Sequence, residues 1–112
     1  MSEYKPIDEC KTVAELLADP ARWTQFEMAR DSNGEECHEK SPLATCFCVE
    51  GACIRIYGNG DRNMLYEEWP SVKAEMKLKN SLGINYGNIA LWNDAPERTH
   101  AEVLEAVRKA GI

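Results

Sequence analysis

The apolar positions near the start of the chain predict two short helical elements. Thr12 and Glu15 have the spacing of a capping box, in which a hydroxyl and a carboxylate satisfy free amides of the first helical turn. A helix is therefore expected to begin near Thr12, and three apolar residues share one of its faces: Val13, Leu16 and Leu17. Asp19-Pro20 has the order of a cap and a first helical residue, which predicts a second turn that brings Trp23 inward.

A β-hairpin is expected after these turns. Side chains over residues 25–31 alternate as they do in a half-buried strand. Asn33-Gly34 follows, and this dipeptide readily adopts the positive φ angles of a tight hairpin. The second strand is expected at residues 35–38. Because an isolated hairpin is only marginally stable, this one has to pack against the helices.

Residues 41–58 allow two structures. Ser41-Pro42 has the order of a cap and a first helical residue, and four apolar residues then share a helical face: Cys46, Val49, Cys53 and Ile56. The same run is rich in residues that favour strands, and Glu50-Gly51 is a candidate hairpin turn. The residues alone leave helix and hairpin equally open.

The last half of the chain predicts further helices. Asp61 can cap a helix whose apolar residues recur every three or four positions: Leu65, Trp69, Val72 and Met76. Pro70 is expected to kink or divide this helix, and Leu82-Gly83 to end it before a loop at 83–88. Residues 89–92 form a short apolar helical turn. Thr99 and Glu102 form a second capping box, which opens a helix that buries three residues: Val103, Leu104 and Val107.

These elements predict a fold class that is mainly α with one β-hairpin (α+β). We expect one compact domain over residues 1–112, with about four to five helices. Residues 1–11 are a candidate flexible segment at the amino terminus.

Composition narrows the setting. The chain has 13 Lys and Arg against 19 Asp and Glu, and its net charge of −6 argues against direct binding to nucleic acid. No apolar run follows Met1, and no stretch approaches the roughly 18 apolar residues of a membrane span, so neither a secretory signal nor membrane contact is expected. An odd number of cysteines, five, favours free thiols in a reducing compartment. We expect a cytoplasmic protein, in a cell or in an infected host.

Five segments in order carry a family resemblance: 17–25 (LADPARWTQ), 29–31 (ARD), 46–52 (CFCVEGA), 92–96 (WNDAP) and 99–103 (THAEV). Over roughly residues 12–110 the chain resembles a family of short bacterial and bacteriophage proteins that has no assigned function. Relatives are rich in Ala and Leu where this chain has its Cys segment, so the resemblance favours a helix over 41–58. It implies a fold and a bacterial or phage setting, and it implies no activity.

The cysteines and histidines raise the possibility of a metal site or a thiol enzyme. Cys46, Cys48 and Cys37-His38 supply soft ligands. In a helix, however, Cys46 and Cys48 would point about 200° apart and could not hold one ion, and buried thiols are ordinary core residues. A cysteine nucleophile would need His38 or His100 as its base. We therefore expect no cofactor, no bound metal and no catalytic residue, and keep a small Cys/His-dependent enzyme or metal-binding protein as an alternative.

Two groups of polar residues are candidate binding surfaces. Four acids surround the expected hairpin tip, where they form either a solvated loop or a docking surface for a basic protein: Asp31, Glu35, Glu36 and Glu39. A second group brackets a tight connection between two helices: Trp92, Asn93, Asp94, Thr99 and His100. Its Asn and Asp side chains either fix the turn or line a small polar pocket beside an indole.

The sequence thus favours a non-catalytic accessory or binding protein of bacterial or phage origin that acts through a protein partner with a basic surface. A further alternative is an acidic inhibitor of a nucleic-acid-binding enzyme. The biochemical activity itself cannot be derived from these residues.

Overall fold

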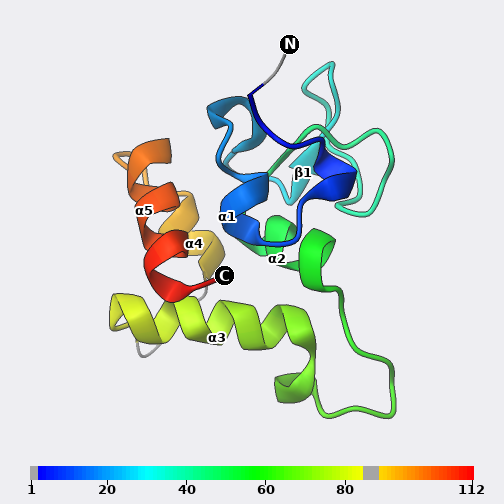
Figure 1. Ribbon diagram of the computed structural model, residues 1–112, viewed down its shortest axis with the longest axis vertical. Coiled ribbons are helices and arrows are strands. Elements are labelled where there is room, and N and C mark those ends of the chain that lie inside the picture. The colour runs from blue at the N-terminus through cyan, green and yellow to red at the C-terminus, as the bar shows by residue number, and fades with distance from the viewer. Residues whose placement is uncertain (1–2, 85–88) are drawn as a thin grey trace.

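The computed structural model describes residues 3–84 and 89–112, and in these residues helices form most of the molecule, with one small sheet on one side (Figure 1). The α-helices are α1 (Val13–Leu16), α2 (Val49–Tyr57), α3 (Pro70–Leu82), α4 (Ile89–Asn93) and α5 (His100–Ala110). The 3-10 turns are η1 (Ile7–Glu9), η2 (Pro20–Arg22) and η3 (Tyr66–Glu68), and the strands are β1 (Ala29–Arg30) and β2 (Cys46–Phe47). The predicted class, mainly α with one hairpin, is confirmed.

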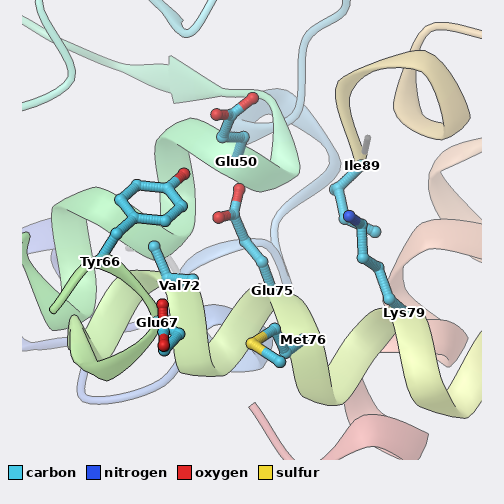
Figure 2. Close-up of a pocket in the computed structure, with 8 residues that line it drawn as sticks. All are labelled: Glu50, Tyr66, Glu67, Val72, Glu75, Met76, Lys79 and Ile89. Carbon is cyan, nitrogen blue, oxygen red and sulfur yellow. The ribbon is translucent and has the colours of Figure 1, made fainter. Parts of the chain in front are cut away.

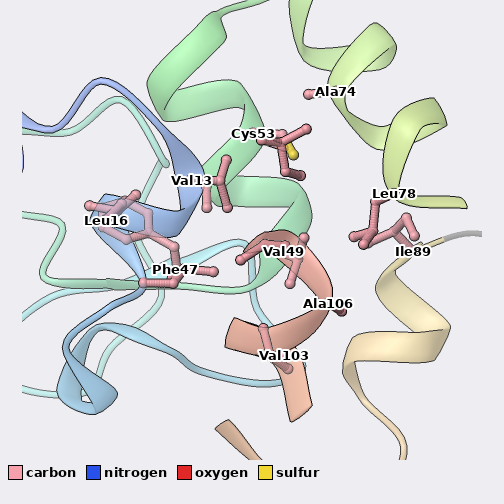
Figure 3. Close-up of a cluster of buried hydrophobic side chains, with 14 of the residues drawn as sticks. Val13, Leu16, Phe47, Val49, Cys53, Ala74, Leu78, Ile89, Val103 and Ala106 are labelled. Carbon is pink, nitrogen blue, oxygen red and sulfur yellow. The ribbon is translucent and has the colours of Figure 1, made fainter. Parts of the chain in front are cut away.

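Helix α2 lies at the centre of the molecule and contacts α1, α3, α4 and β2. Its residues Val49, Ala52 and Cys53 are fully buried. A helix that is covered by several neighbours needs apolar side chains on more than one face. Helix α3 runs across one end of the molecule beneath α2 and α5 (Figure 1). Apolar side chains from all five helices and β2 meet in one core, in which Phe47 and Leu78 are among the largest buried side chains (Figure 3).

Three of the helix caps predicted from the sequence are confirmed, whereas Ser41 and Asp61 do not open helices. The Thr12 hydroxyl accepts a hydrogen bond from the Glu15 amide at 3.0 Å, and the Asp19 carboxylate accepts one from the Ala21 amide at 2.9 Å. Thr99 forms the complete capping box with its partner three residues later. Val103 and Val107 in the helix it opens are fully buried, and Leu104 packs partly buried against the core.

The sheet forms with a different second strand from the one predicted. β1 pairs antiparallel with β2, in the register Ala29 to Phe47 and Arg30 to Cys46. A turn does form, since the Gly34 amide donates to the Asp31 carbonyl at 3.0 Å, and residues 35–38 return beside β1 as expected: Glu36 bridges Arg30, and the Cys37 amide donates to the Ala29 carbonyl at 3.1 Å. They form only this isolated bridge and no regular strand; the strand that forms is β2, which carries the fully buried Phe47, whereas most of 35–38 is exposed.

Residues 41–58 combine both structures that the sequence left open. Strand β2 is followed at once by α2, which the Cys48 thiol caps by accepting from the Gly51 amide at 3.3 Å. The helix favoured by the family resemblance therefore exists, but it begins at Val49 and not after Ser41. Gly51 allows the β1 segment to pass closely, because a Cβ there would lie 2.0 Å from the Met28 carbonyl oxygen.

Of the two outcomes predicted at Pro70, a kink or a division, the structure shows a division: the 3-10 turn η3 precedes Trp69, and α3 begins at Pro70. The helix predicted to start at Asp61 was wrong, because no α-helix begins there. A residue before proline is pushed toward extended backbone, as Trp69 is here, and Pro70 then fits the first helical position. The helix ends as predicted at Gly83, whose φ is 73°. Residues 85–88 of the predicted loop lie outside the described residues. In the described part of the chain, each helix is too short or too polar to cross a membrane.

Candidate functional site

A pocket of about 330 Å³ opens on one side of the packed pair α2 and α3. Its lining comes from four elements, and Figure 2 shows it: Glu50, Tyr66, Glu67, Val72, Glu75, Met76, Lys79 and Ile89. Helix α3 presents one face to it, because positions 72, 75, 76 and 79 recur at helical spacing. The pocket is therefore lined by charged and apolar side chains in equal number.

Two carboxylates converge in this pocket. Glu50 lies in the first turn of α2 and Glu75 in the middle of α3, and both side chains line the same pocket (Figure 2). Both residues are half-buried. Neither carboxylate accepts a hydrogen bond from another described residue, so the pocket holds two carboxyl groups without donors from the described fold.

Burial and neighbouring charge raise the pKa values of both carboxyl groups. Burial, together with the charge of Glu50 and against the opposing effect of Lys79, raises the pKa of Glu75 to about 7. Burial also raises the pKa of Glu50, and the charges of Glu39 and Asp94 act in the same direction. Four carboxylates thus act on this region, and Lys79 is the cation that opposes them in both cases.

The cysteines do not form the geometry expected from a helix. Cys46 lies in β2 and Cys48 caps α2, so the argument that the two thiols diverge along one helix was wrong in its premise. Burial raises the pKa of Cys48 to about 11 and that of Cys53 well above its ordinary value. Within residues 3–84 and 89–112, no three His, Cys, Asp or Glu side chains are grouped so that they could hold a metal ion.

The two histidines hydrogen-bond to the backbone. The Nε2 atom of His100 lies 2.6 Å from the Leu17 carbonyl oxygen, and the Nδ1 atom of His38 accepts from the Lys40 amide at 3.0 Å. His100 also packs its ring against Trp23, with 6.4 Å between ring centroids. It therefore links the start of α5 to the end of α1.

Asn93, a predicted site residue, is fully buried and makes four hydrogen bonds. Its Oδ1 atom accepts from the Trp23 indole at 2.8 Å and from the Val49 amide at 3.1 Å. Its Nδ2 atom donates to the Thr24 carbonyl at 3.1 Å and to the Asp94 carboxylate at 2.9 Å. The amide is saturated by these bonds, so it holds the fold together at this point.

The other residues of the predicted connection also make internal contacts. Asp94 accepts a hydrogen bond from the Phe26 amide at 2.9 Å and holds Phe26 at a φ of 75°, which is unusual for a residue with a side chain. Arg98 lies over the Trp92 ring, 4.4 Å from its centroid, and Thr99 forms its capping box. The structure thus brings these residues together around one turn, and their role in binding stays a prediction.

The four predicted acids of the hairpin have different surroundings. Glu35 and Glu36 are exposed. The Asp31 carboxylate accepts from the backbone amides of its own turn, at 2.8 and 3.1 Å, and the side chain of Glu39 is only 12% exposed beside His38. Two of the four carboxylates therefore project into water, and Glu39 instead adds to the field at Glu50.

The pocket carboxylates were missed from the sequence because they lie 25 positions apart on two helices. A local signal exists for each. Glu50 interrupts the otherwise apolar run 46–54. Glu75 lies on the same face of its helix as the apolar residues Val72 and Met76. An acid on an apolar helical face is a reason to look for a partner group, but it does not name that group.

Comparisons with curated proteins and with solved structures gave no match. The resemblance to a family without assigned function is confirmed by a family model, and the bacterial or phage origin stays a prediction. That model, described as a family of unknown function (DUF6197), matches residues 1–111, and the chain therefore belongs to this family.

Proposed function

We propose that this protein is a non-catalytic binding protein that acts through a protein partner, and that its pocket between α2 and α3 receives a cationic group of that partner. The observation that carries the proposal is that the half-buried carboxyl groups of Glu50 and Glu75 line one pocket together with apolar side chains (Figure 2). The expected partner surface is basic. A more specific version of this proposal is that the partner is a nucleic-acid-binding enzyme, which the acidic charge of the chain also suggests.

Electrostatics support a cation as the occupant. The charge of Glu50 repels that of Glu75, and burial disfavours the charged forms of both groups. A cation placed between them would remove the repulsion and supply the missing hydrogen-bond donors. Lys79 lines the same pocket and compensates only part of this charge, because the pKa of Glu75 is still raised.

The polar groups outside the pocket favour binding over catalysis. A thiol nucleophile needs a low pKa, whereas burial raises the pKa values of Cys48 and Cys53. A general base needs a ring nitrogen close to the nucleophile, whereas the Nε2 atom of His100, at the start of α5, contacts the Leu17 carbonyl at the end of α1. These contacts weigh against the alternative of a Cys/His-dependent enzyme.

The test uses n-butylammonium, which resembles the end of a lysine side chain, and n-butanol as its neutral counterpart. Both are titrated into the protein, and binding is followed by NMR chemical shifts at the pocket residues. Because ion pairs between solvent-exposed groups contribute only about 1 kcal/mol each, the ammonium should bind weakly, with a Kd of roughly 10–100 mM, and the alcohol should bind more weakly still. Because Glu75 must lose its proton, the affinity for the ammonium should rise between about pH 6 and pH 8.

Matched double variants locate the site. Glu50→Gln with Glu75→Gln removes two charges from the pocket, and Glu35→Gln with Glu36→Gln removes the same number from the exposed hairpin. The first pair should abolish the preference for the ammonium, and the second should leave it unchanged. Equal loss in both pairs, or loss in the hairpin pair alone, would refute the pocket and favour the hairpin as the docking surface.

A further inference from the structure

We propose that the partner segment that supplies the cation carries a large apolar side chain beside its Lys or Arg, and that this side chain packs on an exposed apolar shelf next to the pocket. The shelf consists of Met64, Leu65, Tyr66 and Met76. This inference rests on the proposed function, because it places the cation in the same pocket. It adds a second requirement for binding, an apolar side chain next to the cation, which a free cation lacks.

All four shelf residues are large apolar side chains that are exposed to solvent. Leu65 and Tyr66 are each 63% exposed, Met76 is 46% exposed and Met64 is 38% exposed. Tyr66 and Met76 also line the pocket, so the shelf and the carboxylates form one continuous surface. Contiguous exposed apolar side chains with charged groups at their edge are typical of a docking site.

The shelf is held in place by the structure beneath it. The Tyr66 and Trp69 rings pack with 5.3 Å between their centroids. Trp69 in turn covers Gly60, where a Cβ would lie 2.4 Å from the indole and 2.8 Å from the Met64 sulfur. The Ser71 amide donates to the Gly58 carbonyl at 3.0 Å and closes the base of the loop. A partner would therefore meet a preformed surface, which lowers the entropic cost of binding.

The charge beside the shelf selects a basic protein segment over other occupants. Glu50, Glu67 and Glu75 line the pocket against Lys79, and the whole chain carries a net charge of −6. Anionic lipid headgroups would be repelled by these carboxylates. A second copy of the chain would bring the same negative net charge to the contact. A peptide with a basic and an apolar side chain complements both parts of the surface.

Three blocked tripeptides test the inference on the full chain: acetyl-Leu-Lys-Leu-amide, acetyl-Ser-Lys-Ser-amide and acetyl-Leu-Gln-Leu-amide. Leucine on both sides makes the test independent of the direction in which the peptide lies. Partial burial of one leucine should make the first peptide bind roughly fivefold to tenfold more tightly than the second. The third should bind more weakly than the first because it lacks the cation. Affinities are measured by NMR titration, as for n-butylammonium.

Leu65→Ser should remove the advantage of the leucine peptide and leave n-butylammonium binding unchanged. Leu43→Ser is the matched control, because Leu43 is 68% exposed and does not line the pocket. Both side chains are on the surface, so both variants should keep the parental fold, as checked by circular dichroism.

The outcomes separate the two proposals. If n-butylammonium binds at the pocket but the leucine and serine peptides bind equally, the shelf is refuted and the cation site stands. If n-butylammonium does not bind, both proposals fail. A parental protein that sediments as a dimer, and that Leu65→Ser converts to a monomer, would show that a second copy covers the shelf and would overturn the inference.

Discussion

Replacing Glu75 by Gln should stabilise the protein, and increasingly so as the pH is raised. The substitution keeps the shape of the side chain and removes its charge. Since the pKa of Glu75 is raised to about 7 from an ordinary value of 4.5, the folded state holds this proton more tightly than the unfolded state does. The parent therefore loses stability as the pH rises from about 4.5 to about 7, and the variant does not have this loss.

The magnitude follows from the same pKa difference. If fully expressed, a change from 4.5 to about 7 corresponds to about 3 kcal/mol at alkaline pH. Glu75 is only half-buried, so solvent screening reduces this, and we expect about 1–2 kcal/mol. In a chain of this length that difference corresponds to a rise in Tm of roughly 3–8 °C.

The assay is thermal unfolding of parent and variant from about pH 4 to pH 8, with the difference in Tm plotted against pH. That difference should grow between about pH 4.5 and pH 7 and then become constant. Glu68→Gln, at an exposed position outside the pocket, is the control for removal of one negative charge. A difference that is constant over the whole range, or a variant less stable than the parent at pH 8, would refute the account of the carboxylate pair.

Three other changes test the fold and the alternative surface. Asn93→Ala should cost about 3–5 kcal/mol in urea unfolding because it removes four hydrogen bonds of a buried amide, and a loss below about 1 kcal/mol would contradict that role. Thr99→Ala should cost about 1 kcal/mol and Thr99→Ser much less, because serine restores the capping hydroxyl; equal losses by thermal unfolding would show that the cap is unimportant. Glu35→Lys with Glu36→Lys should leave Tm nearly unchanged because both side chains are exposed, and if the hairpin docks a basic partner it should slow association with immobilised polylysine at low salt. Parental association rates at low salt would remove the hairpin from consideration.

Local signals in the sequence predicted the helix ends well. The caps at Thr12, Asp19 and Thr99 depend on hydrogen bonds between residues two or three positions apart, so the sequence contains all the participants. Gly83 is similar, because a glycine that can adopt a positive φ ends a helix by its own backbone. These features require no knowledge of the tertiary structure.

Contacts between distant segments decided the features that were predicted wrongly. β1 pairs with β2 and also makes a single bridge to residues 35–38, and the burial of Phe47 in the common core explains why the regular strand is β2. The pocket has the same origin, since Glu50 and Glu75 meet only because α2 packs on α3. Periodicity predicts which face of a helix is buried but not which other helix covers it.

The hydrogen bonds of Asn93 have a consequence for the order in which the protein can fold during synthesis. The Trp23 indole and the Gln25 amide bond to residues 93 and 95, about 70 positions later in the chain. At a synthesis rate of about 5–20 residues per second, these partners appear roughly 4–14 seconds after the segment that awaits them. The amino-terminal third therefore leaves the ribosome with its indole and amide groups still bonded to water, and native structure there must form late, when the chain is nearly complete.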